Sequence, residues 1–262
     1  MSEPEIMLPV KYTDGFYHIG ARYAPSWLLE STDGLILIDT GMPATLPEIL
    51  EKIAQLGYDV RDVRHILHSH GHIDHIGSTR ALVEMTGART YIGRGDEDTV
   101  SGRDGLQYTN EFKMPFEGAF VPDVIVGDGD TITIGDRTFS FIASPGHTRG
   151  TLSLFFNVTD KGKSYRAGMF GGGGLNTLSA AYLKRYGLPF SLREDFLASI
   201  DRVMDERVEV HVGNHLGDNG HLDKLARMGG EENPVLDGST WGPFLTRRRA
   251  EAVAAFLKDP IE

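Results

Sequence analysis

Five of the ten histidines of this 262-residue chain lie between positions 65 and 75. The stretch begins in an apolar segment with the pattern of a strand and ends where a helical pattern starts. Proteins of the α/β class build their sites just beyond the carboxyl ends of strands. The stretch therefore predicts an α/β fold with a chemical site at this strand-to-helix junction.

The surrounding segments alternate between strand and helix patterns. Strand patterns occupy 10–40, and apolar residues then recur at helical spacing from Pro43 to Leu56. Further elements are expected at these positions: strands at 63–67 and 88–92, a helix at 76–86, several strands over 121–156, a helix at 191–206 and a strand at 208–212. Two blocks that each contain strands and helices predict two sheets packed face to face with helices outside, an αββα sandwich. No repeat or linker divides the chain, so we expect one domain over 1–262, with functional loops at about 93–120 and 171–190.

Composition excludes several kinds of partner. The formal charge of −11 disfavours nucleic acid, and the arginine run at 247–249 is expected on the solvated face of a late helix. No apolar run approaches the roughly 20 residues of a membrane-spanning helix. The chain has no cysteine, so any metal must be held by histidine and carboxylate. The first residues lack a secretory signal pattern, which predicts a cytoplasmic location unless a signal was removed.

Four residues of the histidine-rich stretch are spaced like metal ligands. His70 and His72 are two positions apart, so in an extended segment both side chains project to one side and could share an ion. Asp74 and His75 stand at the entry to a helix, where the chain turns, and could serve a second ion a few ångströms away. The alternative is a helix-capping Asp74 with histidines that only solvate a loop.

The other two histidines of the stretch are interpreted differently. His65 lies within the strand, and counting His68 as a ligand would shift the pattern so that His72 took the place of the aspartate. We expect both to orient or pack other groups.

Ordered motifs along the chain resemble those of the metallo-β-lactamase superfamily. The motifs are His70-x-His72-x-Asp74-His75 followed by Gly77, Leu37-Ile38-Asp39-Thr40-Gly41, Ser144-Pro145-Gly146-His147-Thr148 with Gly150-Thr151, and Asn214-His215. The resemblance extends over roughly residues 10–220 and implies the four-layer αββα fold with a dinuclear metal site at one edge of the sheets.

The resemblance also implies two ligand sets. One zinc ion would be bound by His70, His72 and His147, and the other by Asp74, His75 and His215. Asp39 would support the metal loop, with capping of the helix near residue 43 as the alternative. Thr148 is expected to support the ligands in the same way. Taken alone, His147 could be a turn residue. His211 is expected to pack in its strand, and His221 to face solvent or the site rim.

One family feature is missing. Many members place a bridging aspartate after a later strand, whereas the matching segment here runs from Tyr165 through Met169 to four glycines at 171–174 without a ligand. In lacking this bridging ligand, the chain resembles the third subclass of metallo-β-lactamases. Met169, Asn176 and Arg149 are the candidate substrate contacts.

The resulting prediction is a hydrolase with two zinc ions per chain, in which metal-bound hydroxide attacks a carbonyl and Asp74 orients the hydroxide. A small molecule with a cyclic amide or ester, β-lactam-like, is the expected substrate. A lactonase or thioester hydrolase of the same superfamily is an alternative. Iron or manganese could replace zinc, with iron suiting oxygen chemistry. A non-catalytic metal-binding protein is the remaining alternative.

Overall fold

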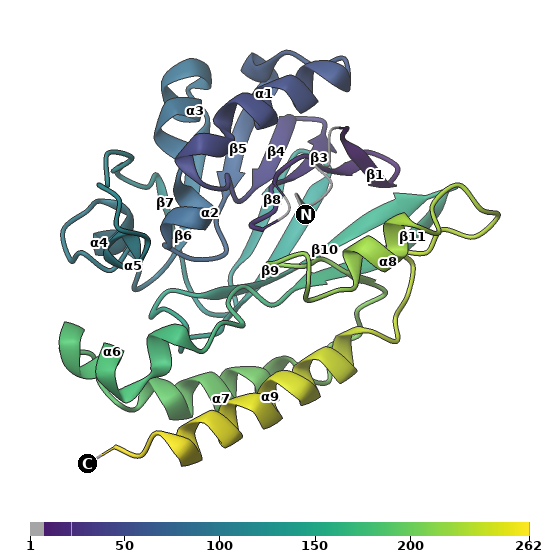
Figure 1. Cartoon of the computed structure of the whole chain (residues 1–262). Helices are drawn as coiled ribbons and strands as arrows, with labels where there is room; N and C mark the ends of the chain where they lie inside the picture. Colours follow the sequence, from purple (N-terminus) through teal and green to yellow (C-terminus); the bar gives the residue numbers. More distant parts are fainter. Residues whose placement is uncertain (1–7, 22, 262) are drawn as a thin grey trace, which may run out of the picture.

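The computed structural model describes residues 8–21 and 23–261 and consists of two stacked β-sheets with helices on both outer faces (Figure 1). This arrangement confirms the predicted αββα layers. The first sheet has the order β1-β2-β3-β4-β5-β6-β7 and the second the order β12-β11-β10-β9-β8. Residues 1–7, which belong to the segment examined for a signal, lie outside the described residues.

The strands of the first sheet are β1 (Val10–Thr13), β2 (Phe16–His18), β3 (Trp27–Ser31), β4 (Gly34–Ile38), β5 (Val63–Leu67), β6 (Arg89–Gly93) and β7 (Val124–Val126). Those of the second are β8 (Thr131–Ile134), β9 (Arg137–Ala143), β10 (Leu152–Asp160), β11 (Lys163–Met169) and β12 (Val210–His211). The helices are α1 (Leu46–Gln55), α2 (Ile73–Ile76), α3 (Thr79–Thr86), α4 (Glu97–Val100), α5 (Thr109–Phe112), α6 (Ala180–Tyr186), α7 (Leu192–Val203), α8 (His221–Leu225) and α9 (Trp241–Lys258). Short 3-10 turns are η1 (Pro43–Thr45), η2 (Val60–Asp62) and η3 (Asn176–Leu178).

In the first sheet, the pairing of neighbouring strands changes from antiparallel to parallel at β4. Neighbouring strands are antiparallel from β1 to β4 and parallel from β4 to β7. Parallel neighbours need a crossover, which α1 provides after β4 and α3 after β5. The carboxyl ends of β4, β5 and β6 therefore meet at one edge of the sheet, and the segments that follow them lie side by side.

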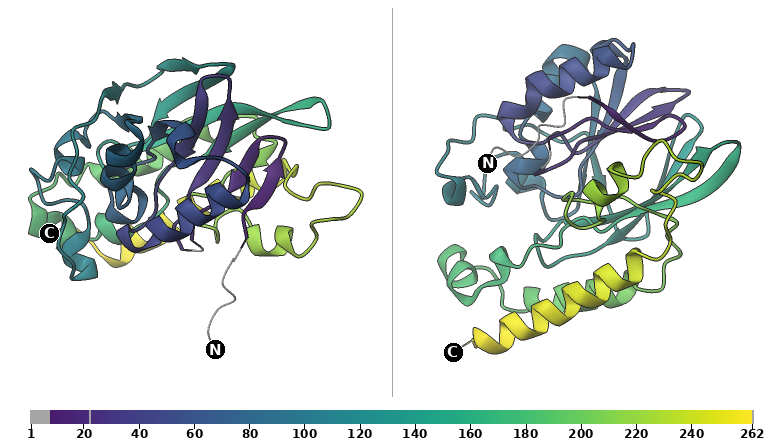
Figure 2. Two further views of the ribbon diagram at one scale, coloured as in Figure 1. Left: turned by 90° about the horizontal axis from the view of Figure 1, so that it is seen from above. Right: turned by 45° about the vertical axis from the view of Figure 1, so that its right-hand side comes forward.

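Three large apolar cores hold the layers together, and a smaller fourth cluster contains Ile76, Ile92 and Val100. One lies between the two sheets and includes Trp27, Phe139 and Phe156. A second, which includes Ile53 and Leu82, joins the first sheet to α1 and α3. The third joins the second sheet to α7 and α9. Figure 2 shows α9 running along this outer layer beside α7.

One predicted helix is divided. The sequence predicted a helix over 76–86, whereas the structure has α2 and α3 separated at Gly77. A Cβ on Gly77 would lie 2.4 Å from Cδ of Pro43, and the Gly77 amide donates to the Gly41 carbonyl. Packing against a distant loop therefore sets the break. No helix in the described part of the chain is long and apolar enough to cross a membrane.

Candidate metal centre

Segments from both sheets meet at the edge where β5 ends. His70, His72, Asp74 and His75 follow β5 in the first sheet. His147 follows β9 and His215 follows β12, both strands of the second sheet. The six predicted ligands therefore come from three loops that are distant in sequence.

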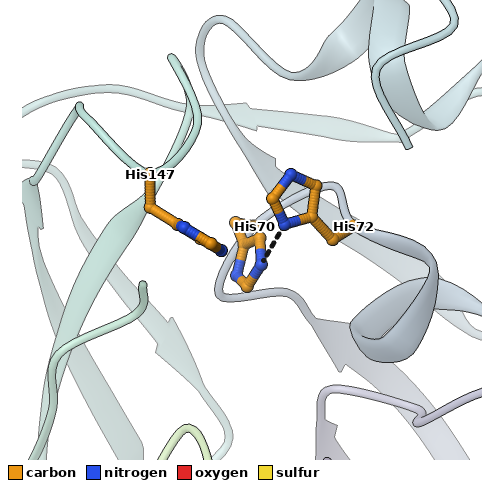
Figure 3. Close-up of side chains that lie close together, drawn as sticks. All are labelled: His70, His72 and His147. Atoms are coloured by element: carbon orange, nitrogen blue, oxygen red, sulfur yellow. Dashed lines mark hydrogen bonds between the residues drawn. The ribbon is translucent and has the colours of Figure 1, made fainter. Parts of the chain in front are cut away.

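Three imidazoles form the first group. The ring centroids of His70 and His72 are 4.7 Å apart, those of His70 and His147 are 4.7 Å apart, and those of His72 and His147 are 4.5 Å apart. One nitrogen from each ring lies within 4.8 Å of the other two, a spacing that could hold a metal ion. Figure 3 shows the three rings converging from two separate segments of the chain.

Two of these rings, His70 and His147, have an outer nitrogen bound to protein outside the cluster. His147 Nδ1 lies 2.9 Å from the Gly174 carbonyl oxygen, and His70 Nδ1 lies 3.1 Å from Ser69 Oγ. The Gly174 carbonyl can only accept, so the proton of His147 lies on Nδ1 and its Nε2 carries no hydrogen. Ser69 Oγ donates its own proton to Asp39 Oδ2, so it accepts from Nδ1 of His70 and leaves Nε2 of His70 without hydrogen. His70 Nε2 lies 3.1 Å from His72 Nδ1, so these two nitrogens point at the same place. Fixing one nitrogen of a ring in this way is how proteins orient histidine ligands.

A second group of possible ligand atoms comes from His70, Asp74 and His75, and the predicted ligand His215 lies beside it. His75 Nε2 is buried, has no hydrogen-bond partner among the described residues, and lies 3.5 Å from Asp74 Oδ2. His215 Nδ1 is 2.7 Å from the Tyr23 carbonyl oxygen, which leaves its Nε2 3.9 Å from the same carboxylate oxygen. An orphaned buried nitrogen beside a carboxylate is the arrangement that a bound cation would satisfy.

Burial keeps the first group neutral. It lowers the pKa of His147 to about 4 and the pKa values of His70 and His72 well below the ordinary value. Burial also lowers the pKa of His215. The pKa of His75 is raised instead, because the carboxylates of Asp74 and Asp39 outweigh its burial. Neutral imidazoles are the form that binds metal, so His70, His72 and His147 need no deprotonation near pH 7, whereas a metal bound by His75 would displace a proton from it.

Asp39 supports the second group. Its Oδ2 accepts from His75 Nδ1 at 2.8 Å, and its Oδ1 accepts from the Ser69 amide at 2.7 Å. The residue has a φ of 59°, a left-handed conformation that is rare outside glycine. The capping alternative is not observed, because η1 begins after Met42 without a side-chain cap.

Sequence reasoning missed Asp96, which follows β6. Its buried carboxylate accepts from the Gly71 amide at 2.8 Å, from Thr148 Oγ1 at 2.7 Å and from the Gly150 amide at 2.9 Å. It thereby ties the segment of His70 and His72 to the segment of His147. Burial raises the pKa of Asp96 to about 6, against the lowering effect of these three donors. Thr148 acts on the site through this carboxylate.

The glycine run at 171–174 passes against His147. A Cβ on Gly174 would lie 2.7 Å from His147 Cε1, and one on Gly172 would lie 2.9 Å from His147 Cβ. Met169, a predicted substrate contact, is fully buried in the core between the sheets and does not line the pocket. That prediction was wrong, because alternation along β11 turns this side chain inward.

The remaining histidines of the sequence stretch pack as expected. Both nitrogens of His68 have protein partners, the Tyr91 carbonyl oxygen at 2.8 Å and Thr79 Oγ1 at 2.7 Å. His65 Nδ1 lies 2.9 Å from the Tyr91 hydroxyl. Neither ring is left with a nitrogen for the metal cluster.

Two later histidines are also buried. His211 packs against Trp241 in the outer core, as predicted. His221 was expected to face solvent or the site rim, and this was wrong: its side chain is fully buried, stacked on Tyr12 and in edge contact with His18. The turn preceding His221 folds inward because these aromatic rings provide an apolar surface for it.

A family model described as "Metallo-beta-lactamase superfamily" matches residues 19–160, more than half of the chain. The chain belongs to the metallo-β-lactamase superfamily. Its fold resembles BJP-1, a subclass B3 metallo-β-lactamase of Bradyrhizobium japonicum, with a TM-score of 0.86, 27 % identity, and coverage of 96 % of this chain and 94 % of that one.

Two curated relatives of this superfamily member are named as a thioesterase and a lactonase. An acyl-coenzyme A thioesterase, MBLAC2 of Bos taurus, is 31 % identical over 160 residues, 53 % of this chain and 56 % of that protein. An N-acyl homoserine lactonase of Bacillus thuringiensis is 26 % identical over 185 residues, 61 % of this chain and 65 % of that protein. The matches thus span less than two thirds of these relatives.

A pocket of about 630 Å³ opens beside the cluster of predicted metal ligands. Its lining comprises Tyr23, His72, Asp74, Tyr108, Phe112, His147, Gly173, Gly174, Asn176, His215, Leu216, Gly217, Asp218 and Arg248. Asn176, a predicted substrate contact, is therefore in place to meet a ligand. Arg149 instead lines a separate small cavity and is directed at Asp104, with 3.4 Å between Nη2 and Oδ2.

Proposed function

We propose that this protein is a dinuclear zinc hydrolase that attacks the carbonyl of a cyclic amide or ester, with a β-lactam-like compound as the preferred class. The observation that carries the proposal is the orientation of the rings: outer nitrogens of His70, His75, His147 and His215 are held by protein, and the inner ones are left for metal.

The donor set fits zinc. His70, His72 and His147 would hold one ion, and Asp74, His75 and His215 the other. Zinc with three imidazole ligands keeps a fourth position for water and lowers the pKa of that water to about 7. Iron or manganese suits the same nitrogen and oxygen donors, so metal analysis is part of the test.

The protein's own residues supply orientation. The Asp74 carboxylate lines the pocket and can accept a hydrogen bond from the attacking water, which fixes the direction of its lone pair toward the substrate. Asp39 holds His75, and Asp96 holds the loops of His70 and His147, so the ligands are preorganised. Tyr108 and Phe112 offer an apolar wall to the organic part of a substrate.

The substrate class is supported by similarity and by ligand type. BJP-1, one of the solved structures that this chain resembles, is a subclass B3 metallo-β-lactamase. The missing bridging carboxylate is the sequence feature that already resembled the third subclass. Thioesters and homoserine lactones are the second candidates, because curated relatives carry those names. All three classes share a carbonyl with a leaving group.

The test measures metal content and turnover on the same preparation. Protein loaded with zinc, iron or manganese is assayed against β-lactams, N-acyl homoserine lactones and acyl thioesters, with and without chelator. We expect two zinc ions per chain and hydrolysis of a β-lactam that chelator abolishes. Turnover confined to the lactones or thioesters would contradict the β-lactam class. Activity with iron alone would contradict zinc, and retained zinc without any turnover would contradict catalysis.

A further inference from the structure

Two residues in the left-handed conformation bracket a short helix beside the pocket. Tyr108 has a φ of 67° and Lys113 a φ of 54°, and α5 lies between them. A bulky side chain at such a φ is strained, and the strain persists only where surrounding contacts hold the backbone in place. The contacts of α5 therefore decide where this helix and its flanking side chains lie.

Two aromatic rings of this segment line the pocket. The ring centroids of Tyr108 and Phe112 are 5.5 Å apart, and the Tyr108 ring lies 5.2 Å from the ring of the predicted ligand His72. Phe112 is 37 % exposed, so part of its apolar surface faces the open space beside the cluster. An apolar group bound next to the cluster would cover both rings and remove them from water.

Polar contacts join α5 to α6, which lies below it in Figure 1. Glu111 Oε1 accepts a hydrogen bond from the Tyr186 hydroxyl at 2.7 Å and lies 3.6 Å from Nη1 of Arg185. Asn110 Nδ2 also contacts the Tyr186 hydroxyl, at 3.2 Å. The Glu111 side chain is only 18 % exposed, so water competes little for its carboxylate. We name this contact the Glu111–Tyr186 latch.

The latch connects two segments that are distant in sequence and that both reach the pocket. α5 belongs to the connection between β6 and β7, whereas α6 follows the glycines at 173–174, which line another part of the pocket. The ring centroids of Tyr108 and Tyr182 add a contact at 5.9 Å. α6 is fixed at its own start, where the Ala180 amide donates to Asp259 Oδ2 at 2.6 Å. The anchored α6 therefore holds α5, and not the reverse.

We propose that Glu111 and Tyr186 are positioning residues, which hold α5 so that Tyr108 and Phe112 form a wall for an apolar group of the substrate. Without the latch, the strained residues at the two ends of α5 relax and the wall moves away from the cluster. The site then keeps its metal ligands and loses its hold on the apolar group. The inference rests on the proposed metal-centred function and narrows its substrates to carbonyl compounds that carry an aromatic or similarly bulky apolar group.

Binding of two zinc ligands tests the wall without turnover. Acetohydroxamate and 3-phenylpropanohydroxamate share a metal-binding group and differ by a benzyl group. Their dissociation constants for zinc-loaded protein are measured by calorimetry for the wild type and for Tyr108→Ala, Tyr186→Phe, Glu111→Gln and Glu111→Ala. Tyr58→Phe is the matched control, because the Tyr58 hydroxyl also donates to a glutamate, Glu30, in a hollow that is separate from the pocket.

Hydrogen exchange measures the position of α5 directly. Exchange of the peptide that covers residues 105–118 is followed by mass spectrometry in each variant, and zinc content and melting temperature are recorded. This peptide should exchange faster in Tyr186→Phe and Glu111→Ala than in the wild type, because the backbone opens more often once the latch is lost. It should exchange at the wild-type rate in Tyr58→Phe.

The wild type should bind the phenyl compound roughly tenfold more tightly than acetohydroxamate, because its ring is buried against Tyr108 and Phe112. Tyr108→Ala should lose most of this preference. Tyr186→Phe and Glu111→Ala should reduce it about threefold or more, with zinc content and the affinity for acetohydroxamate unchanged. Glu111→Gln should keep more of it, since the amide oxygen still accepts from Tyr186, and Tyr58→Phe should keep all of it.

Three other results would overturn the assignment. An unchanged preference or unchanged exchange in Tyr186→Phe and Glu111→Ala overturns the latch, and equal binding of both compounds by the wild type overturns the wall; either result leaves the metal-centred function intact. If the latch variants lose zinc together with both compounds, α5 supports the metal ligands and the positioning role is overturned. Failure of the wild type to bind zinc or either compound overturns the proposed zinc function and this inference with it.

Discussion

Replacing His211 by Phe is expected to remove part of the protein's loss of stability in mild acid. His211 is 1 % exposed, packs against Trp241 and Phe244, and has an Nδ1 without a partner among the described residues. Burial lowers the pKa of His211 to about 3 from its ordinary 6.5. Between these values the unfolded chain binds a proton that the folded protein does not, so the free energy of unfolding falls as pH falls.

The size of the effect follows from the two pKa values. A group whose pKa is lowered by folding stabilises the fold fully above its unfolded pKa, and the contribution is lost as pH falls toward the folded pKa. With a pKa of 6.5 in the unfolded chain and about 3 in the folded protein, linkage predicts that the free energy of unfolding falls by about 2 kcal/mol between pH 7 and pH 5. At pH 5 the folded group is still neutral, so any folded pKa below about 4 gives nearly the same figure.

Urea unfolding of metal-free protein at pH 7 and pH 5 measures this contribution. The other buried histidines titrate in both proteins, so the difference between wild type and His211→Phe isolates one residue. Phe244→Leu, which disturbs the same core without removing a titratable group, should lower the free energy of unfolding equally at both pH values. A His211→Phe protein with the same pH dependence as the wild type would refute the reasoning.

The remaining predictions concern the cluster. His147→Ala should lose one metal equivalent and all hydrolysis, and full activity with unchanged metal content would contradict its role. His215→Ala should likewise retain one of two metals, whereas His211→Phe should retain both; the reverse would mean that the last motif is misaligned. Asp96→Asn should weaken metal binding about 10- to 100-fold in chelator competition, because an amide cannot accept all three donors, while the exposed Asp98→Asn should not. Chelator should remove the ions in two phases, with the weaker ion in the Asp74 group. Met169→Asp should leave both phases in place and lower the melting temperature, because it buries a charge, and Met169→Leu should have little effect on either.

Local pattern was enough to predict much of the fold. The strand at 63–67 is found at the predicted residues as β5, with Val63, Ile66 and Leu67 buried and Arg64 exposed. The helix predicted over 43–56 is found as η1 followed by α1. The division between α2 and α3 could not be predicted, since it depends on Pro43 packing against Gly77 across the fold.

The site residues also fall into those that local spacing could predict and those that it could not. His70, His72, Asp74 and His75 are close in sequence, so their spacing alone indicated a cluster. His147 was open to interpretation as a turn residue, and only the resemblance to a family placed it with the others. Its position depends on two sheets meeting, which local periodicity does not encode.

The position of Asp96 just after a predicted strand could have indicated its role in the site. It follows β6 as Asp39 follows β4, and both strands end at the edge where β5 delivers the histidines. Acidic residues just beyond the carboxyl ends of parallel neighbours converge there. The position of Arg248 at the pocket had no such signal, because it depends on which face of α9 is turned toward the second sheet.

The missing bridging carboxylate is explained by packing at the end of β11. Met169 ends β11 facing the core, and a Cβ on Gly171 would lie 1.9 Å from the Leu152 carbonyl oxygen. The chain here passes too close to its neighbours to carry a ligand. Because the proposed ions lack this carboxylate, an anionic ligand bound at the cluster would offset the repulsion between two dications, so the second zinc ion should bind more tightly in the presence of a carboxylate substrate analogue than in its absence.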